Sequence, residues 1–368
     1  MREFIERNSV NSVEKFVRAT SAALTFGEQA VVYIEQLKSR NRRPIRRKTL
    51  ECYQNALDTH LVPLIGDVPL ADVNNSVFKH VVATMVTKRH SIKKECPKGK
   101  PYSPETINTI TKVMKEVVES LLDENGEPIY PRKWNNDFAD LPIIHRSEQK
   151  RPSMTVAELE QGLARSKSGK RHLFALLAVT GLRISEALGL EARHVSSDGL
   201  LIQVRQTLDG TNIQQVTKTE NGKRDVDIAP EFAAVLARFA ASHPGFLFAT
   251  STGRPMTQRN ALRYMAAKFG PGGFHRLRRF RTERLREGGA PRFLENHWLG
   301  WTASDDRAGM GDLYGRGLLD NDAYKREFAA KIGVGFSLAA FQEPQLGQLG
   351  QSSTEETETE LAVVNCGS

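Results

Sequence analysis

Four side chains in the C-terminal third of the chain have the chemistry needed to act on a phosphodiester. His275 and Arg278 stand three residues apart, Trp301 ends the triplet Leu299-Gly300-Trp301, and Tyr314 follows thirteen positions later. A guanidinium is permanently charged and fork-shaped, so Arg278 can hold phosphate oxygens, and an imidazole can exchange a proton near neutral pH. A phenol beside such cations can lose its proton and attack phosphorus, which would leave a covalent phosphotyrosine.

Two further cations lie upstream of this set. Arg183 stands at the start of a predicted helix, and Glu186, three residues on, shares its face and can orient the guanidinium. The alternative reading is an ordinary surface ion pair, which is common on helices. Lys218 comes just before the turn signal Asn221-Gly222, where a long cation can reach a bound backbone. A lone lysine in a hairpin is otherwise a weak signal.

The charge distribution points to a polyanionic partner. The chain has 368 residues, 39% hydrophobic and 26% charged, which suits an ordinary soluble protein with room for two domains. Residues 336–368 carry five glutamates and no Lys or Arg, so removing them from the net charge of +9 leaves +14 on the remainder. Nucleic acid is the default partner of such a basic body, and a merely basic, soluble protein is the alternative.

Other classes of protein find little support in the sequence. The cysteines (Cys52, Cys96 and Cys366) are too few and too scattered for a disulfide framework or a zinc site, and they suit a reducing cytosol. The first residues lack the apolar segment of a signal peptide, and the stretch from 174 to 179 is too short to span a bilayer. No carboxylate cluster or phosphate-cradling loop is apparent, so we expect a cytoplasmic protein without metal or cofactor.

Residues 25–140 are predicted to form a helical bundle with basic connections, after a lead-in of residues 1–24 that is expected to be flexible. Thr25 and Glu28 form a capping-box pattern, and Ser103-Pro104 begins another helix. Seven positive charges fall within the eleven positions from 38 to 48. Such runs are usually solvated loops, but in a basic domain they favour contact with phosphates. The predicted DNA-binding residues are Arg42, Arg43, Arg46, Arg47, Lys48, Lys93, Lys94 and Lys98.

A polar linker, residues 141–152, separates this bundle from a second domain at 153–335. Helical spacing alternates there with three predicted strands at 200–206, 211–219 and 223–228, joined by Asp209-Gly210 and Asn221-Gly222. The remaining residues, 336–368, read as an acidic, disordered tail. The predicted fold is therefore mainly α with a small antiparallel β-sheet.

The order of the candidate residues resembles the active-site set of the tyrosine recombinases, the phage-integrase family. The resemblance rests on Thr180-Gly181-Leu182-Arg183-Ile184-Ser185-Glu186, Thr217-Lys218-Thr219, His275-Arg276-Leu277-Arg278, Leu299-Gly300-Trp301 and Leu313-Tyr314. It implies a helical, SAM-like core-binding domain followed by a mixed α/β catalytic domain. Each motif alone is weak, whereas five in family order are specific.

The resemblance also implies a role for each residue. Arg183 and Arg278 would grip the scissile phosphate and stabilise its transition state. Lys218 would protonate the departing 5′ oxygen, and His275 would assist proton transfer. Trp301 stands where the family has His or Trp and would donate a hydrogen bond. Tyr314 would attack to form a 3′-phosphotyrosine, and the bond energy kept in that linkage removes any need for ATP or metal.

The segment between Trp301 and Tyr314 is longer than is usual in the family, which leaves Tyr324 as a rival nucleophile. We favour Tyr314, because Tyr324 falls on a predicted helix, 320–332, that shares one stripe with Phe328 and Ile332. The resemblance suggests that this helix docks onto a neighbouring subunit, and packing on its own domain is the alternative. The implied partner is double-stranded DNA, with a monomer in solution, a homotetramer on paired sites, and room for accessory DNA-bending proteins.

The leading interpretation is a site-specific recombinase or integrase of a mobile genetic element. A type IB topoisomerase shares the chemistry but relaxes supercoils without strand exchange, and the basic helical domain favours the recombinase over it. A DNA-binding protein with a decayed active site is the third hypothesis, which the complete set of expected catalytic residues disfavours.

Overall fold

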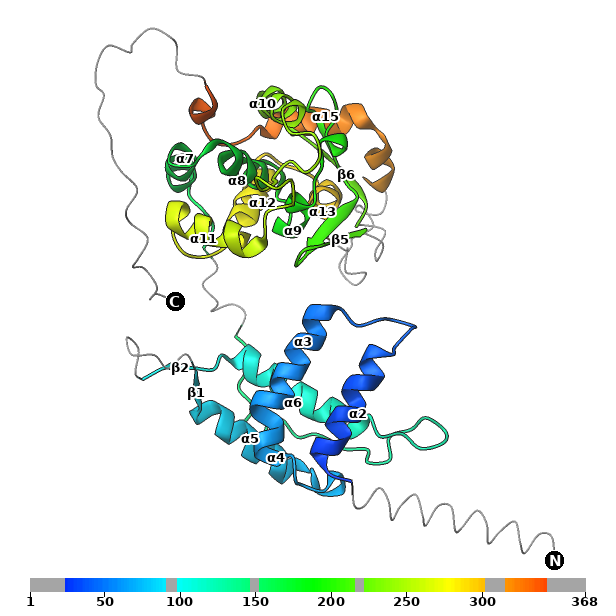
Figure 1. Ribbon diagram of the computed structural model, residues 1–368. Helices are drawn as coiled ribbons and strands as arrows, with labels where there is room; N and C mark the ends of the chain where they lie inside the picture. Colours follow the sequence, from blue (N-terminus) through cyan, green and yellow to red (C-terminus); the bar gives the residue numbers. More distant parts are fainter. Residues whose placement is uncertain (1–23, 91–97, 146–151, 216–221, 302–314, 343–368) are drawn as a thin grey trace, which may run out of the picture. The chain divides into compact units, whose positions relative to one another are not determined.

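The computed structural model describes residues 24–90, 98–145, 152–215, 222–301 and 315–342. The chain divides into two compact units, Met1–Gln149 and Lys150–Ser368, each with its own hydrophobic core. The ribbon drawing shows the first unit in blue to cyan and the second in green to orange (Figure 1). The predicted fold class is confirmed: both units are built mainly from helices, and the strands form small antiparallel pairs.

The first unit is a helical bundle centred on α6 (Pro104–Glu119). Ser103 caps this helix with its hydroxyl, Pro104 occupies the first turn, and Ile107, Ile110, Met114 and Val117 form its buried stripe. Around α6 lie α2 (Phe26–Lys38), α3 (Arg47–Ala56), a π-helical turn (Leu57–Leu61), α4 (Val62–Ile65), a 3₁₀ turn (Leu70–Asp72) and α5 (Asn75–Thr87). A two-residue pair, β1 (Arg89–His90) with β2 (Lys100–Pro101), completes the unit. The predicted capping box of Thr25 and Glu28 is present at the start of α2.

The second unit is built around α8 (Ser168–Thr180). Its residues from Leu173 to Thr180 are all buried, as expected of a helix that is apolar on every side. Helices α7 (Val156–Ala164), α9 (Ile184–Leu188) and α12 (His275–Glu287) pack against it. Among its described residues, the other helices are α10 (Pro230–Ala241), α11 (Gln258–Phe269), α13 (Arg292–Leu299) and α15 (Asp322–Ile332), with 3₁₀ segments at Ala192–His194, Gly315–Asp320 and Ala339–Phe341.

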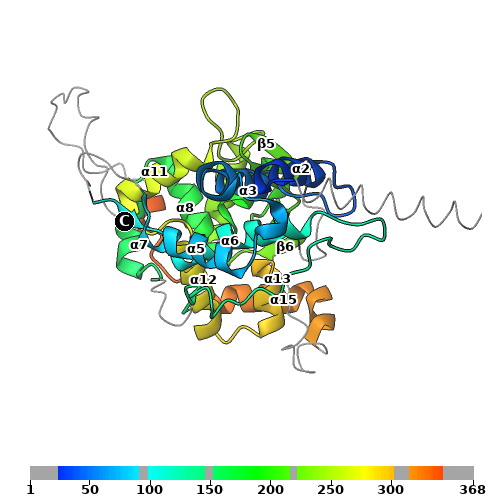
Figure 2. The same ribbon diagram turned by 90° about the horizontal axis from the view of Figure 1, so that it is seen from below.

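Two antiparallel strand pairs lie beside these helices. β4 (Gln206–Asp209) and β5 (Asn212–Gln215) form the hairpin predicted from Asp209-Gly210. β3 (Leu201–Val204) pairs with β6 (Arg224–Asp227), so the first predicted strand is split at Arg205. α13 lies beside β6 in both ribbon views (Figures 1 and 2). This contact places the end of α13 next to β6, the strand that follows the predicted turn at Asn221-Gly222.

The C-terminal end of the described chain packs on the second unit beyond the predicted start of the tail at 336. Phe336 is buried with its ring 6.3 Å from that of Phe280, and Phe341 stands edge-on to Phe232. Arg171 donates to the carbonyl of Ala340. Aromatic burial thus extends the domain to residue 342, and the acidic residues from 343 onward lie outside the described ranges.

Helix α15 packs on its own domain, which is the alternative that the sequence left open. Tyr324, Phe328 and Ile332 are half-buried against the catalytic core, with the ring of Tyr324 stacked 6.4 Å from that of Phe293. The stripe therefore contacts the core of its own domain, and because its side chains are only partly buried, docking onto a neighbouring subunit stays a prediction. Among all the described residues, no helix is both long and apolar enough to cross a membrane.

Candidate active site

Arg183 is held at the junction of α8 and α9. α8 ends at Gly181, whose φ of 67° is the left-handed conformation that glycine tolerates best. Arg183 then serves as the N-terminal cap of α9. Its Nη1 donates to Glu186 Oε1 at 2.9 Å, as expected from their spacing, and its Nη2 donates to the carbonyl oxygen of Gly300 at 3.2 Å. The side chain keeps 45% of its surface exposed, so the guanidinium remains accessible to a ligand.

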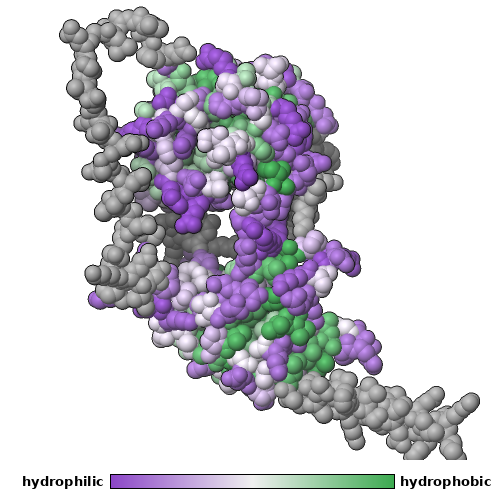
Figure 3. All heavy atoms as spheres, viewed as in Figure 1, coloured by the Kyte–Doolittle hydropathy of each residue, from purple (hydrophilic) through white to green (hydrophobic). Residues whose placement is uncertain are grey.

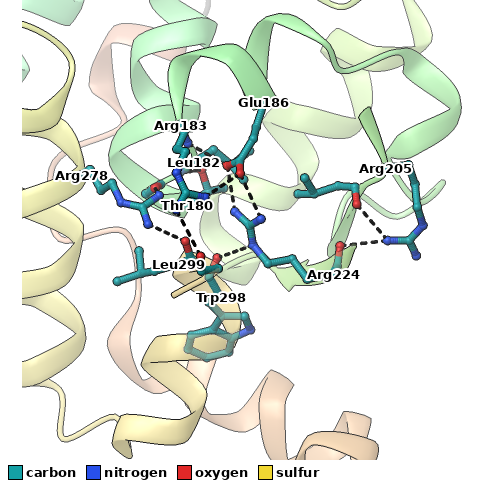
Figure 4. A network of polar contacts seen from close by, with 12 residues as sticks. Thr180, Leu182, Arg183, Glu186, Arg205, Arg224, Arg278, Trp298 and Leu299 are labelled. Atoms are coloured by element: carbon teal, nitrogen blue, oxygen red, sulfur yellow. Dashed lines mark hydrogen bonds and ion pairs between the residues drawn. The ribbon is translucent and has the colours of Figure 1, made fainter. Parts of the chain in front are cut away.

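Arg278 reaches the same place from α12. Its Nη1 donates to the carbonyl oxygen of Gly181 at 2.8 Å, and its Nη2 donates to that of Leu299 (Figure 4). The two guanidinium groups therefore bind carbonyls of adjacent residues, Leu299 and Gly300, whose α-carbons are only about 3.8 Å apart. Burial and the nearby Arg183 lower the pKa of Arg278 to about 10, which leaves it charged at neutral pH.

The end of α13 supplies the anchor for both arginines. The last carbonyls of a helix have no partner within the helix and carry its partial negative charge. α13 ends at Leu299, and Gly300 follows in the left-handed conformation with a φ of 62°. A Cβ at Gly300 would lie 2.7 Å from Nη1 of Arg224, so this position requires glycine for space as well as for conformation. The motif Leu299-Gly300-Trp301 thus acts through its backbone as well as through its indole.

His275 begins α12, one helical turn before Arg278, and its side chain is exposed. Partial desolvation, followed by the charges of Arg278, Arg279 and Arg183, lowers the pKa of the imidazole below its ordinary value of 6.5. Because the charges of both Arg183 and Arg278 act on the imidazole of His275, these three predicted catalytic residues lie close together. At neutral pH the imidazole is therefore uncharged and able to accept a proton.

Trp301 joins this group through its ring. The guanidinium of Arg278 lies over the indole at 5.6 Å from the ring centroid, a cation–π arrangement. Its backbone N–H donates to the carbonyl of Asn296, which continues the turn at the end of α13. The predicted hydrogen bond from Trp301 to a phosphate stays a prediction. The neighbouring Trp298 has another task, since it is buried and donates through Nε1 to Asp227 at 2.9 Å.

A buried ion pair beneath Arg183 was not predicted from the sequence. Arg224 on β6 donates through Nη1 and Nη2 to the two carboxylate oxygens of Glu186, at 3.2 and 2.9 Å. Its Nε donates to the carbonyl of Trp298 at 3.0 Å. The local signal was the strand alternation, which puts Arg224 on the same inward face as Val226. An arginine at an inward position of a strand calls for a buried acidic partner.

Lys218 and Tyr314, predicted as general acid and nucleophile, lie outside the described residues. The chain leads from β5 toward Lys218. The partner of β5 in the hairpin, β4, contacts α9, which is the helix that Arg183 caps. Gly315, the residue after Tyr314, lies so close to Phe293 of α13 that a Cβ there would be 2.5 Å from the ring. Their roles stay predictions.

The rival nucleophile Tyr324 lies in the packed interface between α15 and α13. Its ring stacks with Phe293 and also contacts Phe328, at 4.9 Å between centroids. This packing supports the structural role that the sequence favoured for Tyr324.

The predicted DNA-binding residues that fall in the described chain are all exposed on the first unit. Arg42, Arg43 and Arg46 occupy the connection between α2 and α3, Arg47 and Lys48 open α3, and Lys98 precedes β2. Lys93 and Lys94 lie outside the described residues. On the face shown in Figure 3, hydrophilic side chains cover most of the visible surface. Exposure makes these residues available to phosphates, and DNA contact by them stays a prediction.

Solved structures similar to this chain include integrases in complex with DNA. One is the Tn1549 transposon integrase in complex with transposon right-end DNA, with a TM-score of 0.58 and 19% identity over 82% of this chain and all of that one. Another is the lambda integrase dimer bound to a COC′ core site, with a TM-score of 0.56 and 16% identity over 79% of this chain and 78% of that one. A lambda integrase tetramer on a Holliday junction matches with a TM-score of 0.53 and 17% identity.

Comparison with models of known protein families finds no match, and neither does comparison with curated proteins. At such low identity the structural likeness establishes the fold. The described chain therefore has the fold of the tyrosine recombinases, as its motifs predicted.

Proposed function

We propose that this protein is a site-specific DNA recombinase, an integrase of a mobile genetic element, that cuts and rejoins strands through a 3′-phosphotyrosine. The observation that carries the proposal is the convergence of Arg183 and Arg278 on the adjacent carbonyls at the end of α13, beside a neutral imidazole. Two fixed cations aimed at one point suit the charge that develops on a phosphoryl group under attack. The DNA-bound integrases of the same fold support the substrate class.

The proposed reaction is a balanced exchange of one ester for another. The oxygen of Tyr314 attacks the phosphorus while its proton passes to a base. The neutral imidazole of His275 can serve as that base. The bond from phosphorus to the 5′ oxygen breaks, and Lys218 supplies the proton that makes a free 5′-hydroxyl. Attack by a second 5′-hydroxyl reverses these steps. The phosphotyrosine keeps the bond energy of the broken ester, so the reaction requires no nucleotide. Arg183 and Arg278 neutralise the charge that a metal ion would otherwise stabilise, so it requires no metal ion either.

Strand exchange requires active sites on two duplexes, and we infer a monomer in free solution that becomes a tetramer on paired sites. The tetramer of lambda integrase on a Holliday junction is a precedent within the same fold. In this chain the stripe of Tyr324, Phe328 and Ile332 on α15 is partly buried against its own core, and its part in joining neighbours is open to test in the tetramer.

A pool of nicked duplexes tests the proposal whatever the sequence of the target site. Each duplex has a randomised central segment and a nick that releases a short 5′ fragment after cleavage, which prevents rejoining. The full chain is incubated with the pool in excess chelator, denatured, and analysed for DNA that stays attached to protein. We expect enrichment of a defined sequence in the attached DNA. Absence of any attached DNA, or attachment only with added Mg²⁺, would refute the proposal.

The enriched duplex then separates the recombinase from its alternatives. A plasmid with two copies of the site should yield exchanged products, together with tetrameric complexes in sedimentation. Relaxation of supercoils without exchange would favour the topoisomerase, and binding without covalent attachment would favour a decayed enzyme.

A further inference from the structure

Arg224 ties together three elements that carry the candidate site. It is 3% exposed on β6, its two Nη groups bind both oxygens of Glu186, and its Nε binds the carbonyl of Trp298. Glu186 is 4% exposed on α9, and its carboxylate also accepts hydrogen bonds from the guanidinium and the backbone N–H of Arg183. Trp298 belongs to the last turn of α13, directly before Leu299 and Gly300. One guanidinium therefore contacts both the partner of Arg183 and the helix end that anchors both catalytic arginines (Figure 4).

The energetics of this pair favour a positioning role over a purely stabilising one. Removing two charges from water costs several kcal/mol per ion, so apolar residues often stabilise such a place at least as well. Glu186 cannot lose its charge easily, because hydrogen bonds and charge from Arg224 and Arg183 outweigh desolvation and lower its pKa. The carboxylate thus stays ionised between two guanidinium groups. Arg224 takes the inner side of that carboxylate, and only the exposed Arg183 remains able to turn toward a ligand.

We propose that Arg224 is a positioning residue for the catalytic arginines, acting through Glu186 on Arg183 and through the end of α13 on the shared carbonyl anchor. The inference rests on the proposed function, since it concerns the same phosphate-binding site. With Arg224 bound to its inner side, the Glu186 carboxylate is held in one orientation, and this fixes the direction in which Arg183 points. Without Arg224, Arg183 is the one side chain among the described residues that still forms an ion pair with the buried carboxylate, and it turns inward, away from the phosphate.

Matched variants separate positioning from stabilisation. Arg224→Met removes the charge at similar length, Glu186→Gln removes its partner, and the double variant removes the buried pair. Arg224→Lys keeps the positive charge but lacks the planar guanidinium that binds both carboxylate oxygens at once. Arg205→Met is the control. Arg205 forms an ion pair with Asp225 on β6 at 2.5 Å and donates to the backbone carbonyl of Arg224 at 3.0 Å, but among its described hydrogen bonds it contacts neither the Arg224 guanidinium nor Glu186. Each full-length variant is tested for thermal unfolding, for affinity for the enriched duplex, and for the rate constant of covalent attachment at saturating protein.

We expect Arg224→Met to slow attachment about tenfold or more, the scale of a misaligned catalytic group, with affinity changed by less than about threefold. Arg224→Lys should recover part of the rate, and Arg205→Met should keep the wild-type rate. The double variant is decisive. Its unfolding temperature should recover toward wild type, because no unpaired buried charge remains. Its rate should stay low, because Arg183 has lost the carboxylate that fixes its direction and the end of α13 has lost its contact with Arg224. Recovery of the rate together with stability would overturn the proposal.

A second measurement decides the matter independently of activity. In the free protein, the N–H resonances of Arg183 can be identified by their loss in Arg183→Lys, and their exchange with water can be measured. Exchange about tenfold slower in Arg224→Met, as expected of a guanidinium that turns inward onto the buried carboxylate, but unchanged in Arg205→Met, supports positioning. Unchanged exchange in Arg224→Met contradicts it. If the wild-type protein attaches to no duplex in the pool, the proposed function fails, and these exchange rates alone decide the role of Arg224.

Discussion

Arg183 and Arg278 belong to different helices and donate to the carbonyl oxygens of neighbouring residues, Gly300 and Leu299. The end of α13 thus sets the spacing of the two guanidinium groups before any substrate is bound. Preorganised charge of this kind needs no rearrangement when the transition state forms, which is why it is catalytically effective.

Replacing either arginine by lysine should therefore impair cleavage although the charge is kept. Lysine has no planar fork and cannot hold a helix-end carbonyl and phosphate oxygens together. We expect Arg183→Lys and Arg278→Lys each to lower the rate of covalent attachment by about 10²-fold or more. Single-turnover kinetics on the enriched duplex checks this, with Arg292→Lys on the exposed start of α13 as the control. Rates within threefold of wild type for both variants would remove the arginine pair from the mechanism.

The spacing also depends on the absence of a side chain at Gly300. Gly300→Ala would add a Cβ within 2.7 Å of Arg224, whereas Gly289→Ala, at a similar φ of 72°, would meet nothing within 4 Å. Both variants incur the left-handed strain of about 1–2 kcal/mol. We expect both to lower the unfolding temperature, and only Gly300→Ala to reduce attachment as well. Equal activity of the two variants would show that the contact with Arg224 is dispensable.

The charges around His275 predict a testable titration. The pKa of this imidazole is lowered by partial burial and by Arg278, Arg279 and Arg183, so its protonated form becomes dominant only at a pH below 6.5. Arg279→Gln removes one repelling charge and should raise the pKa toward the ordinary value. Arg286→Gln, near the other end of α12 and paired with Glu295, should leave it unchanged. NMR titration of the free protein, with His275→Gln for assignment, measures all three values. A wild-type pKa above 6.5 would contradict the electrostatic picture.

Local sequence patterns predicted much of this architecture, because caps, turns and side-chain periodicity act over a few residues. The capping box at Thr25, the Asp209-Gly210 hairpin and the pairing of Arg183 with Glu186 are examples. Contacts between distant residues were beyond such patterns. Arg224 and Glu186 are 38 positions apart, and only the inward register of one strand hinted at their meeting.

The C-terminal segment was misjudged for the same reason. Phe336 and Phe341 lie in a short apolar stretch, 334–341, just before the acidic residues, and their partners Phe280 and Phe232 come from helices much earlier in the chain. The stripe on α15 was recognised as amphipathic, but periodicity identifies an apolar face without identifying what covers it. In this chain the stripe on α15 packs against its own domain, through Phe293 and the surrounding core.

The identity of the attacking residue tests the central claim most directly. Covalent complexes trapped on the enriched duplex in excess chelator can be digested with protease and nuclease, and the peptide that keeps a 3′-linked nucleotide can be sequenced by mass spectrometry. The proposed function predicts that the nucleotide is attached to Tyr314, that Tyr314→Phe yields no adduct while retaining DNA affinity, and that Tyr324→Phe yields the normal amount. A nucleotide on Tyr324 or on any other residue, or an adduct that persists in Tyr314→Phe, would contradict it.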